Sequence, residues 1–533
     1  MRRKAAIPFL FAGALFAAAP LAEAASNLVF CSEGSPAGFD PAQYTAGTDF
    51  DASAETVFNR LTQFERGGTR VIPGLAQRWD IADDGKTYTF HLRPGVKFHS
   101  TDYFTPSREF DADDVLFTFE RMLDKQQPFR KAYPTEFPYF TDMGMDTNIA
   151  RIEKLDPMTV RFTLNQVDAA FIQNLAMSFA SIQSAEYAEQ LLAQGKPEQI
   201  NQKPIGTGPF VFKRYQKDAQ IRFTGNRDYW QPDEVKIDNL IFAINTDASV
   251  RMQKLKAGEC QVSLFPRPAD LQSLKNDPKL AMPSQPGFNL GYIAYNVQHP
   301  PLDKLEVRQA LDMAVNKQAI IDAVYQGAGQ RAVNAMPPTQ WSYDDSIRDA
   351  AFDPDKARAL LKAAGVAEGT EITLWAMPVQ RPYNPNAKLM AEMLQADWAK
   401  IGIKARIVSY EWGEYLKRAK NGEHDAMLIG WSGDNGDPDN WLGTLYGCDA
   451  VDGNNYSKWC DPQYDALVKD AKRVTDQGQR GTLYKQAQQI LMAQLPITPI
   501  AHSTVYQPMR KNVEDFRISP FALNAFYGVG IAK

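Results

Sequence analysis

Ile372-Thr373-Leu374-Trp375 is a short apolar run with the composition of a β-strand. Apolar residues at helical spacing follow it from Asn386 to Ile401, and a second strand-like run, Ala405-Arg406-Ile407-Val408, comes next. Strand, helix and strand in succession predict an α/β domain in this part of the chain.

The alternation of helices and strands extends outward from this unit. Helical spacing predicts further helices at 305–324, 354–364, 412–421 and 479–495. Strand patterns dominate the first half of the chain, as at 87–92 and 160–164. Between them we expect a helix from Ala112 to Leu123, which Asp111 would cap.

An acidic loop follows the strand-like run Ala426-Met427-Leu428-Ile429. Its sequence is Gly430-Trp431-Ser432-Gly433-Asp434-Asn435-Gly436-Asp437-Pro438-Asp439-Asn440. Glycines in the loop permit the backbone to approach a ligand closely, and Pro438 keeps a helix from starting earlier. Asp434 would then offer a fixed carboxylate to a cation, with the ring of Trp431 beside it. By itself the motif is compatible with a turn or with a site for an ammonium group.

The N-terminus has the pattern of a cleaved secretory signal. Met1-Arg2-Arg3-Lys4 is basic, an apolar stretch runs from Ile7 to Leu21, and Ala22-Glu23-Ala24 places small residues where signal peptidase cuts. We expect residues 1–24 to be removed near Ala24/Ala25 and the mature chain to be exported. An uncleaved membrane anchor is the disfavoured alternative, because the apolar stretch is short for a span of ~20 residues.

Length, charge and cysteine content narrow the class of protein. The 533 residues exceed what one hydrophobic core usually serves, which favours about three domains. The formal net charge is −5, so nucleic acid and anionic lipid are poor candidates as partners. Four cysteines in an exported chain permit three disulfide pairings. Cys448 and Cys460 form the natural local pair, which would leave Cys31 to join Cys260.

Patterns of catalysis and metal binding are missing from the sequence. The five histidines are scattered, no Gly-x-Ser-x-Gly elbow occurs, and paired cysteines would leave no thiol nucleophile. Asp434, Asp437 and Asp439 mimic part of an EF-hand, but position 445, where a carboxylate ligand is needed, is leucine. We therefore expect no catalysis, no cofactor and no metal; a secreted peptidase is the disfavoured alternative.

Several motifs resemble those of one family, the family 5 extracellular solute-binding proteins of peptide-importing ABC transporters. They are Cys31-Ser32-Glu33-Gly34-Ser35-Pro36, Ile72-Pro73-Gly74-Leu75-Ala76, Gly206-Thr207-Gly208-Pro209-Phe210, Val307-Arg308-Gln309-Ala310-Leu311 and Arg381-Pro382-Tyr383-Asn384-Pro385. The resemblance extends over essentially the whole mature chain. The acidic loop from Trp431 to Asn440, together with Gln380-Arg381-Pro382-Tyr383, is similar to the dipeptide-binding branch of the family.

The resemblance implies a two-lobed periplasmic-binding-protein fold of type II, in the peptide/nickel cluster, with mixed sheets flanked by helices. Three domains would be assembled from separate segments. Domain I would consist of 25–57, 208–286 and 505–533, domain II of 58–207, and domain III of 287–504. Cys31 and Cys260 would then both lie in domain I.

The resemblance also implies which residues bind a peptide. Asp434 would receive its α-ammonium group and Arg381 its α-carboxylate. Thr45, from the opposite lobe, and the segment Trp431-Ser432-Gly433 would bind the peptide main chain. Relatives commonly have threonine where this chain has Ser432, and the serine keeps the hydroxyl.

Physical chemistry supports such a pair of charges. A zwitterionic ligand in a water-poor cleft needs partners for both of its end charges, because an unpaired buried charge is costly. Guanidinium suits a carboxylate and a carboxylate suits an ammonium group. Since one residue extends ~3.5 Å, a fixed pair of charges selects ligands of two residues. Tyr383 and Trp412 are candidate walls for the side-chain pockets.

We therefore expect a monomeric periplasmic receptor that captures dipeptides and delivers them to an inner-membrane ABC permease. Longer peptides, opine-like conjugates and haem are alternative ligands, since the resemblance includes relatives that carry them. A part in chemotaxis is a further option for which the sequence gives no direct sign.

Overall fold

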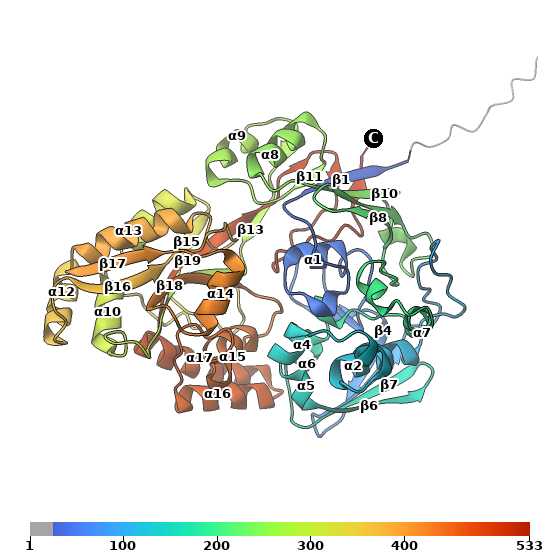
Figure 1. Ribbon diagram of the computed structural model, residues 1–533, viewed down its shortest axis with the longest axis horizontal. Helices are drawn as coiled ribbons and strands as arrows, with labels where there is room; N and C mark the ends of the chain where they lie inside the picture. Colours follow the sequence, from blue (N-terminus) through green and yellow to red (C-terminus); the bar gives the residue numbers. More distant parts are fainter. Residues whose placement is uncertain (1–24, 533) are drawn as a thin grey trace, which may run out of the picture.

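The computed structural model describes residues 25–532, and the predicted signal peptide lies outside this part. In Figure 1 the elements from β14 to α17 form one lobe, and the elements from β1 to β12, together with β20, form the second lobe beside it. Within residues 25–532 no helix has the length and apolar character needed to cross a membrane.

A seven-stranded sheet in the second lobe joins distant parts of the chain, in the order β12-β20-β11-β1-β10-β9-β8. Its strands are β1 (Asn27–Ser32), β8 (Phe210–Gln216), β9 (Gln220–Gly225), β10 (Asn239–Ile244), β11 (Val262–Ser263), β12 (Leu280–Ala281) and β20 (Met509–Arg510). Strand β1 runs parallel to β10 and β11, whereas β9 runs antiparallel to both β8 and β10. The sheet is therefore mixed.

The same lobe holds a four-stranded antiparallel sheet, in the order β4-β5-β7-β6. Its strands are β4 (Ala76–Ile81), β5 (Thr87–Leu92), β6 (Ile149–Asp156) and β7 (Thr159–Leu164). Helix α2 (Ala112–Leu123) packs on it through Phe119, whose ring lies 5.1 Å from that of Phe162. Shorter helices next to this sheet are α1 (Gly47–Ala52), α4 (Pro138–Asp142) and α6 (Phe171–Asn174).

The sheet of the other lobe has the order β13-β19-β14-β18-β16-β17, with β15 beside β19. Its strands are β13 (Ser284–Pro286), β14 (Asn289–Tyr295), β15 (Gly329–Arg331), β16 (Thr370–Trp375), β17 (Ile403–Val408), β18 (Ala426–Ser432) and β19 (Ile497–Tyr506). Strand β16 is parallel to both β17 and β18, and β14 is antiparallel to β18.

The helices of this lobe flank the sheet. They are α10 (Leu305–Met313), α12 (Pro354–Ala363), α13 (Ala387–Ala399), α14 (Trp412–Lys420), α15 (Asp439–Tyr446), α16 (Pro462–Arg473) and α17 (Gln477–Gln494). Aromatic side chains such as Trp375, Trp398 and Trp441 are fully buried between helices and sheet. The predicted α/β architecture with mixed sheets flanked by helices is confirmed.

The prediction of one continuous helix over residues 305–324 is wrong. The segment 305–324 divides into α10, which ends at Met313, then α11 (Lys317–Ile320) and a π-helical turn η6 (Ile321–Tyr325). The side chain of Asn316 accepts a hydrogen bond from the backbone of Ala319 and so caps a new helix. Apolar spacing alone did not reveal this interruption, because a side-chain cap overrides it locally. By contrast, the predicted helix from Ala112 to Leu123 is confirmed, with Asp111 in a capping box.

Both predicted disulfides are present. The Cα atoms of Cys31 and Cys260 lie 5.8 Å apart, and those of Cys448 and Cys460 lie 4.7 Å apart. The first bridge joins β1 to Cys260, two residues before the neighbouring strand β11. It ties the first described strand to a segment 229 positions away. The domain boundaries themselves stay a prediction.

The two lobes contact each other through charged groups at the end of α16. The ammonium group of Lys472 lies 3.0 Å from Asp439 of its own lobe and 3.9 Å from Asp168 of the other. The backbone N–H of Ala169 donates to the carbonyl of Lys472 at 2.8 Å. Burial raises the pKa of Asp168 to about 6, and the charge of Lys472 opposes that rise. Lys472 thus neutralises two carboxylates where the lobes meet.

We expect Lys472→Met to lower the free energy of unfolding by about 1–3 kcal/mol, because it leaves buried Asp168 without its cation. Urea denaturation measures this. The control is Lys469→Met on the same helix, since Lys469 is partly exposed and its pair with the exposed Asp449 is worth about 0–1 kcal/mol. Equal losses in the two variants would contradict the role of Lys472 between the lobes.

Candidate functional site

Three of the residues predicted to bind a ligand follow three neighbouring parallel strands. Arg381 lies in the loop after β16, Trp412 begins α14 after β17, and Asp434 follows β18. Because the carboxyl ends of parallel strands meet at one edge of a sheet, the loops after them gather there. Open α/β sheets bind ligands at this edge.

The carboxylate of Asp434 reaches across to the other lobe. The hydroxyl of Tyr139, in α4, donates to its Oδ1 atom at 2.6 Å. On its own side Asn440 holds the loop together: its amide donates to Asp434 Oδ2 at 3.2 Å, and its oxygen accepts from the Asp434 backbone and from the indole of Trp431. The sequence motif contained Asn440, but its bridging role depends on the fold of the loop.

The environment of Asp434 favours a cationic ligand. Burial raises the pKa of its carboxyl group to about 6, although the hydrogen bonds from Tyr139 and Asn440 lower it in part. With a pKa of about 6, the carboxyl group of Asp434 is ionised at neutral pH. Its hydrogen bonds come from Tyr139 and Asn440, and no lysine or arginine among the described residues forms an ion pair with it. An ammonium group placed here would supply the missing charge.

Arg381 is held by a tight turn and by an aromatic ring. Its backbone exchanges two hydrogen bonds of 3.0 Å with Asn384, and its guanidinium carbon lies 4.4 Å from the ring centroid of Trp412. Trp412 in turn stacks on Tyr415, with an interplanar angle of 22°. Trp412 therefore supports the guanidinium of Arg381. Its role as a wall of a side-chain pocket stays a prediction.

The charge of Arg381 also acts on the opposite lobe. Glu33 follows β1 there, and burial raises the pKa of its carboxyl group, while the charges of Arg251 and Arg381 lower it. The charge of Arg381 is thus felt by a carboxyl group of the other lobe. Sequence analysis quoted Glu33 only within a family motif and gave it no role.

Two glycines on adjacent strands seat the Arg381 turn against the sheet. Gly291 of β14 and Gly430 of β18 are paired in register. A Cβ atom on Gly430 would overlap the ring of Tyr383, and one on Gly291 would lie 2.6 Å from the Tyr383 carbonyl oxygen. Tyr383 is buried, and its carbonyl accepts a hydrogen bond from the hydroxyl of Tyr325 at 2.7 Å. In this structure Tyr383 anchors the turn; its role as a pocket wall is untested.

Strand β18 offers backbone groups next to Asp434. Strand β16 pairs with it only at Ala426 and Met427, so 428–432 have their described strand partner on the β14 side. Gly433 extends the pairing with the β14 side by one more hydrogen bond, since its N–H donates to the carbonyl of Phe288 at 2.9 Å. The exposed edge around Trp431 and Ser432 suits an extended peptide main chain.

Thr45 lies in the other lobe, in the exposed loop between Pro41–Gln43 and α1. The structure gives it no side-chain contact with Asp434 or Arg381, so its role stays a prediction. Tyr139, which contacts Asp434 directly, was missed by the sequence analysis. No local pattern marks it, because only the packing of the lobes brings it there.

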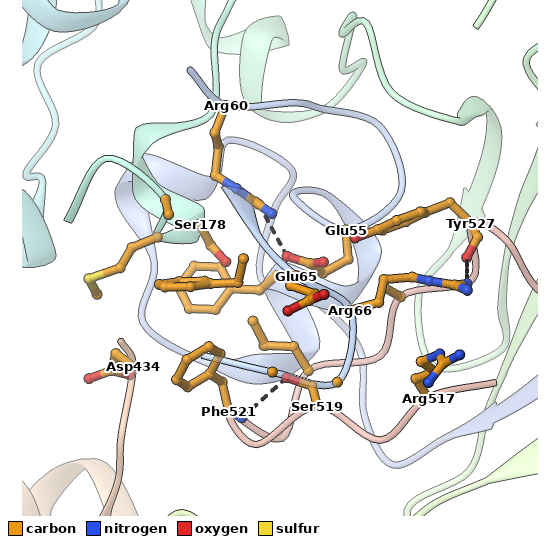
Figure 2. Close-up of a pocket in the computed structure, with 18 of the residues that line it drawn as sticks. Glu55, Arg60, Glu65, Arg66, Ser178, Asp434, Arg517, Ser519, Phe521 and Tyr527 are labelled. Atoms are coloured by element: carbon orange, nitrogen blue, oxygen red, sulfur yellow. Dashed lines mark hydrogen bonds and ion pairs between the residues drawn. The ribbon is translucent and has the colours of Figure 1, made fainter. Parts of the chain in front are cut away.

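A cavity opens at Asp434 and extends into the other lobe. Figure 2 shows Asp434 at one end and Arg517 and Tyr527 at the opposite end. As for metals, residues 25–532 contain no group of three or more His, Cys, Asp or Glu side chains placed to hold an ion.

Comparisons with known proteins show what this chain is similar to. The model of the bacterial extracellular solute-binding proteins, family 5, matches residues 70–453. Di/tripeptide-binding protein 1 of Pseudomonas aeruginosa is 82% identical over 531 residues, covering 100% of this chain and 99% of that protein. Heme-binding protein A of Haemophilus influenzae is 48% identical over 512 residues, covering 96% of this chain and 93% of that protein.

A solved structure gives a similar result. The crystal structure of a dipeptide-binding protein from Pseudoalteromonas sp. SM9913, in complex with Met-Leu, has a TM-score of 0.87 and 38% sequence identity. The match covers 95% of this chain and 100% of that one.

We expect Gly430→Ala to lower the free energy of unfolding by about 1–3 kcal/mol, since the added methyl group overlaps the Tyr383 ring in a packed core. The variant should also displace the Arg381 turn. Urea denaturation measures the first effect. Gly481→Ala on α17 is the control, because its Cβ would meet Trp341 at an ordinary 3.6 Å. A neutral Gly430→Ala would show that the turn does not depend on this contact.

Proposed function

Because the chain belongs to the bacterial extracellular solute-binding proteins of family 5, we propose that it captures dipeptides between its lobes in the periplasm and delivers them to an inner-membrane ABC permease. The observation that carries this proposal is the half-buried, ionised Asp434 beside the end of β18 that β16 leaves unpaired, on the same sheet edge as Arg381. The fold predicted for the family, two-lobed and of type II, is confirmed by the match to the solved structures.

The charges of the site suit the two ends of a free peptide. Asp434 receives the α-ammonium group, and Arg381, stacked on Trp412, receives the α-carboxylate in its planar fork. The edge of β18 around Trp431, Ser432 and Gly433 binds the peptide main chain. Thr45 approaches the ligand from the opposite lobe when the cleft closes.

Closure follows from contacts that the ligand makes with both lobes. Asp434 of one lobe contacts Tyr139 of the other, so the end of the site that would hold the ammonium group already joins the two lobes. A ligand shifts the equilibrium toward the closed form only through its greater affinity for that form. The permease then recognises the closed, monomeric receptor.

The similarity to dipeptide-binding and di/tripeptide-binding proteins supports dipeptides as the ligand class, in agreement with the paired charges. Haem is the second candidate, favoured by the 48% identity to a haem-binding protein. Haem lacks the α-ammonium group that Asp434 would need. A haem titration in which dipeptide displaces the Soret band would reveal shared use of the cleft.

We expect Asp434→Ala and Arg381→Ala each to weaken dipeptide binding by about 3–5 kcal/mol, the range for removing one partner of a buried charge pair. Titration calorimetry with Ala-Ala measures the loss. Arg381→Lys should lose less, because it keeps the charge but not the fork. Asp449→Ala, an exposed carboxylate, is the matched control and should bind as the wild type does.

Capped ligands identify which end each residue holds. N-acetyl-Ala-Ala should bind poorly to the wild type, and most of that discrimination should vanish in Asp434→Ala. The amide of Ala-Ala should behave in the same way toward Arg381→Ala. Equal wild-type affinities for free and capped dipeptides would refute the proposal that the termini are read.

Dipeptide affinity should fall by about tenfold per pH unit below pH 6, because Asp434 must lose its proton before it accepts the ammonium group. The α-carboxylate of the ligand, with a pKa of about 3.5, stays ionised in this range. Calorimetry from pH 4.5 to 7.5 tests this. Asp434→Asn should abolish the step, which separates it from any titration of Glu33 near Arg381. A flat profile in the wild type would contradict the assignment.

A further inference from the structure

The loop that carries Asp434 continues into a contact with the other lobe. Asn435, the next residue, is buried, and its amide nitrogen donates to the side-chain oxygen of Asn174 at 2.9 Å. The same nitrogen lies 3.4 Å from the Sδ atom of Met177. Asn174 ends α6 and Met177 follows shortly after it, so both acceptors belong to the other lobe.

The loop holds the side chain of Asn435 in position from its own side. The side-chain oxygen of Asn435 accepts from the backbone N–H of Asp437 at 2.9 Å. The carboxylate of Asp437 in turn accepts from Arg480 of α17 at 2.8 Å, and both groups are buried. These bonds lie within one lobe, so they do not depend on the contact with Asn174. A donor that is already oriented loses little conformational freedom when such a contact forms.

Gly436 brings the backbone of the same loop against the other lobe. A Cβ atom on Gly436 would lie 2.9 Å from the Cβ atom of Thr69 and 3.0 Å from the Thr69 carbonyl oxygen. Thr69 lies in the turn between β2 (Thr62–Phe64) and β3 (Val71–Pro73). Gly436 is not among the residues with a positive φ, so its backbone conformation is open to other residues. The other lobe is therefore what excludes a side chain here.

These contacts are separate from the groups proposed to bind the peptide. Asn174, Asn435, Gly436 and Thr69, all of them described, do not line the cavity that opens at Asp434. They are also uncharged, so they do not compete for the end charges of a ligand. Because both amides can bond to water when the lobes part, their contact contributes the modest net stabilisation of a neutral hydrogen bond.

We propose that Asn435 and Asn174, together with the close approach of Gly436 to Thr69, form a latch that holds the lobes together around any peptide in the cleft. The inference rests on the proposed function, since it takes lobe closure as the step that traps the ligand. The latch prolongs the bound state by the same factor for every peptide, because it touches none of them. Asn174 and Asn435 are thus positioning residues that act on the closed form.

Asn174→Ala tests the latch, because it removes the acceptor and leaves the bonds of the Asp434 loop to its own lobe intact. A peptide leaves after the lobes separate, so the dissociation rate and Kd should both rise about three- to tenfold, the factor for one neutral hydrogen bond. The association rate should change by less than about twofold, because peptides enter while the lobes are apart. Stopped-flow tryptophan fluorescence measures the rates, and calorimetry measures Kd. Ala-Ala, Phe-Ala, Ala-Phe and Lys-Ala should all show the same factor.

Asn226→Ala is the matched control. Asn226 is a buried amide of the same lobe as Asn174, and its nitrogen donates at 2.9 Å to the carbonyl of Gly208, which also belongs to that lobe. This variant should lose stability but keep the dissociation rates of the wild type. The comparison separates the latch from the general effect of losing a buried hydrogen bond.

Gly436→Ala acts on the second contact through sterics. The added methyl group meets Thr69 only when the lobes are together, so the dissociation rate should again rise, by about tenfold. Thr69→Gly in the same chain removes the Cβ atom that the methyl group meets and should restore much of the wild-type rate. Gly453→Ala is the control, because its Cβ atom would lie 3.4 Å from Ala450 of its own lobe. Near-UV circular dichroism checks that every variant is folded.

Each outcome supports or overturns the latch. A rise in the dissociation rate that is equal for the four peptides supports it. Unchanged rates in both variants, a rise that depends on the side chains of the peptide, or a change in the association rate alone overturns it. If the wild type binds none of the four peptides, the proposed function itself is wrong and the latch falls with it.

Discussion

The parallel pairing of β16 with β17 and β18 is the constraint on which the site depends. It places the loops after three strands at one sheet edge, and these loops carry Arg381, Trp412 and Asp434. The early end of β16 also leaves the last residues of β18 without a strand on that side. Backbone groups and two opposite charges are thereby brought to one edge before any ligand arrives.

The second lobe covers this edge and changes the electrostatic environment of Asp434. Tyr139 covers the Asp434 carboxylate, and the surrounding protein raises its pKa to about 6. At neutral pH the Asp434 carboxylate remains ionised, and its described partners are hydrogen-bond donors without a positive charge. An ammonium ligand would stabilise this carboxylate by supplying that charge. The contact of Lys472 with Asp168 joins the lobes on the side where the Asp434 loop continues into α15. The lobe contact and the candidate site are therefore linked through the segment that leads from Asp434 into α15.

Some elements were predictable from sequence because the signals are local. Apolar spacing and a capping aspartate located the helix from Ala112 to Leu123. Cysteine spacing predicted the local disulfide Cys448–Cys460, and the two remaining cysteines then predicted Cys31–Cys260. The break of the 305–324 helix was not predicted, because the side-chain cap formed by Asn316 leaves no mark on the apolar periodicity. The motif around Asp434 and Arg381 gave candidate residues, but neither their shared sheet edge nor the Gly291–Gly430 seat of the Arg381 turn could be read from spacing.

The sequence by itself determined the α/β class, the family resemblance and the candidate charges, since these depend on residue type and short-range pattern. Only the tertiary structure decided that Tyr139 would meet Asp434, that Trp412 would lie under Arg381, and that a cavity lined by distant segments would continue beyond the carboxylate. The physical reason is that these neighbours come from segments far apart in the chain. Their contacts arise from the packing of two lobes, and no local periodicity encodes such packing.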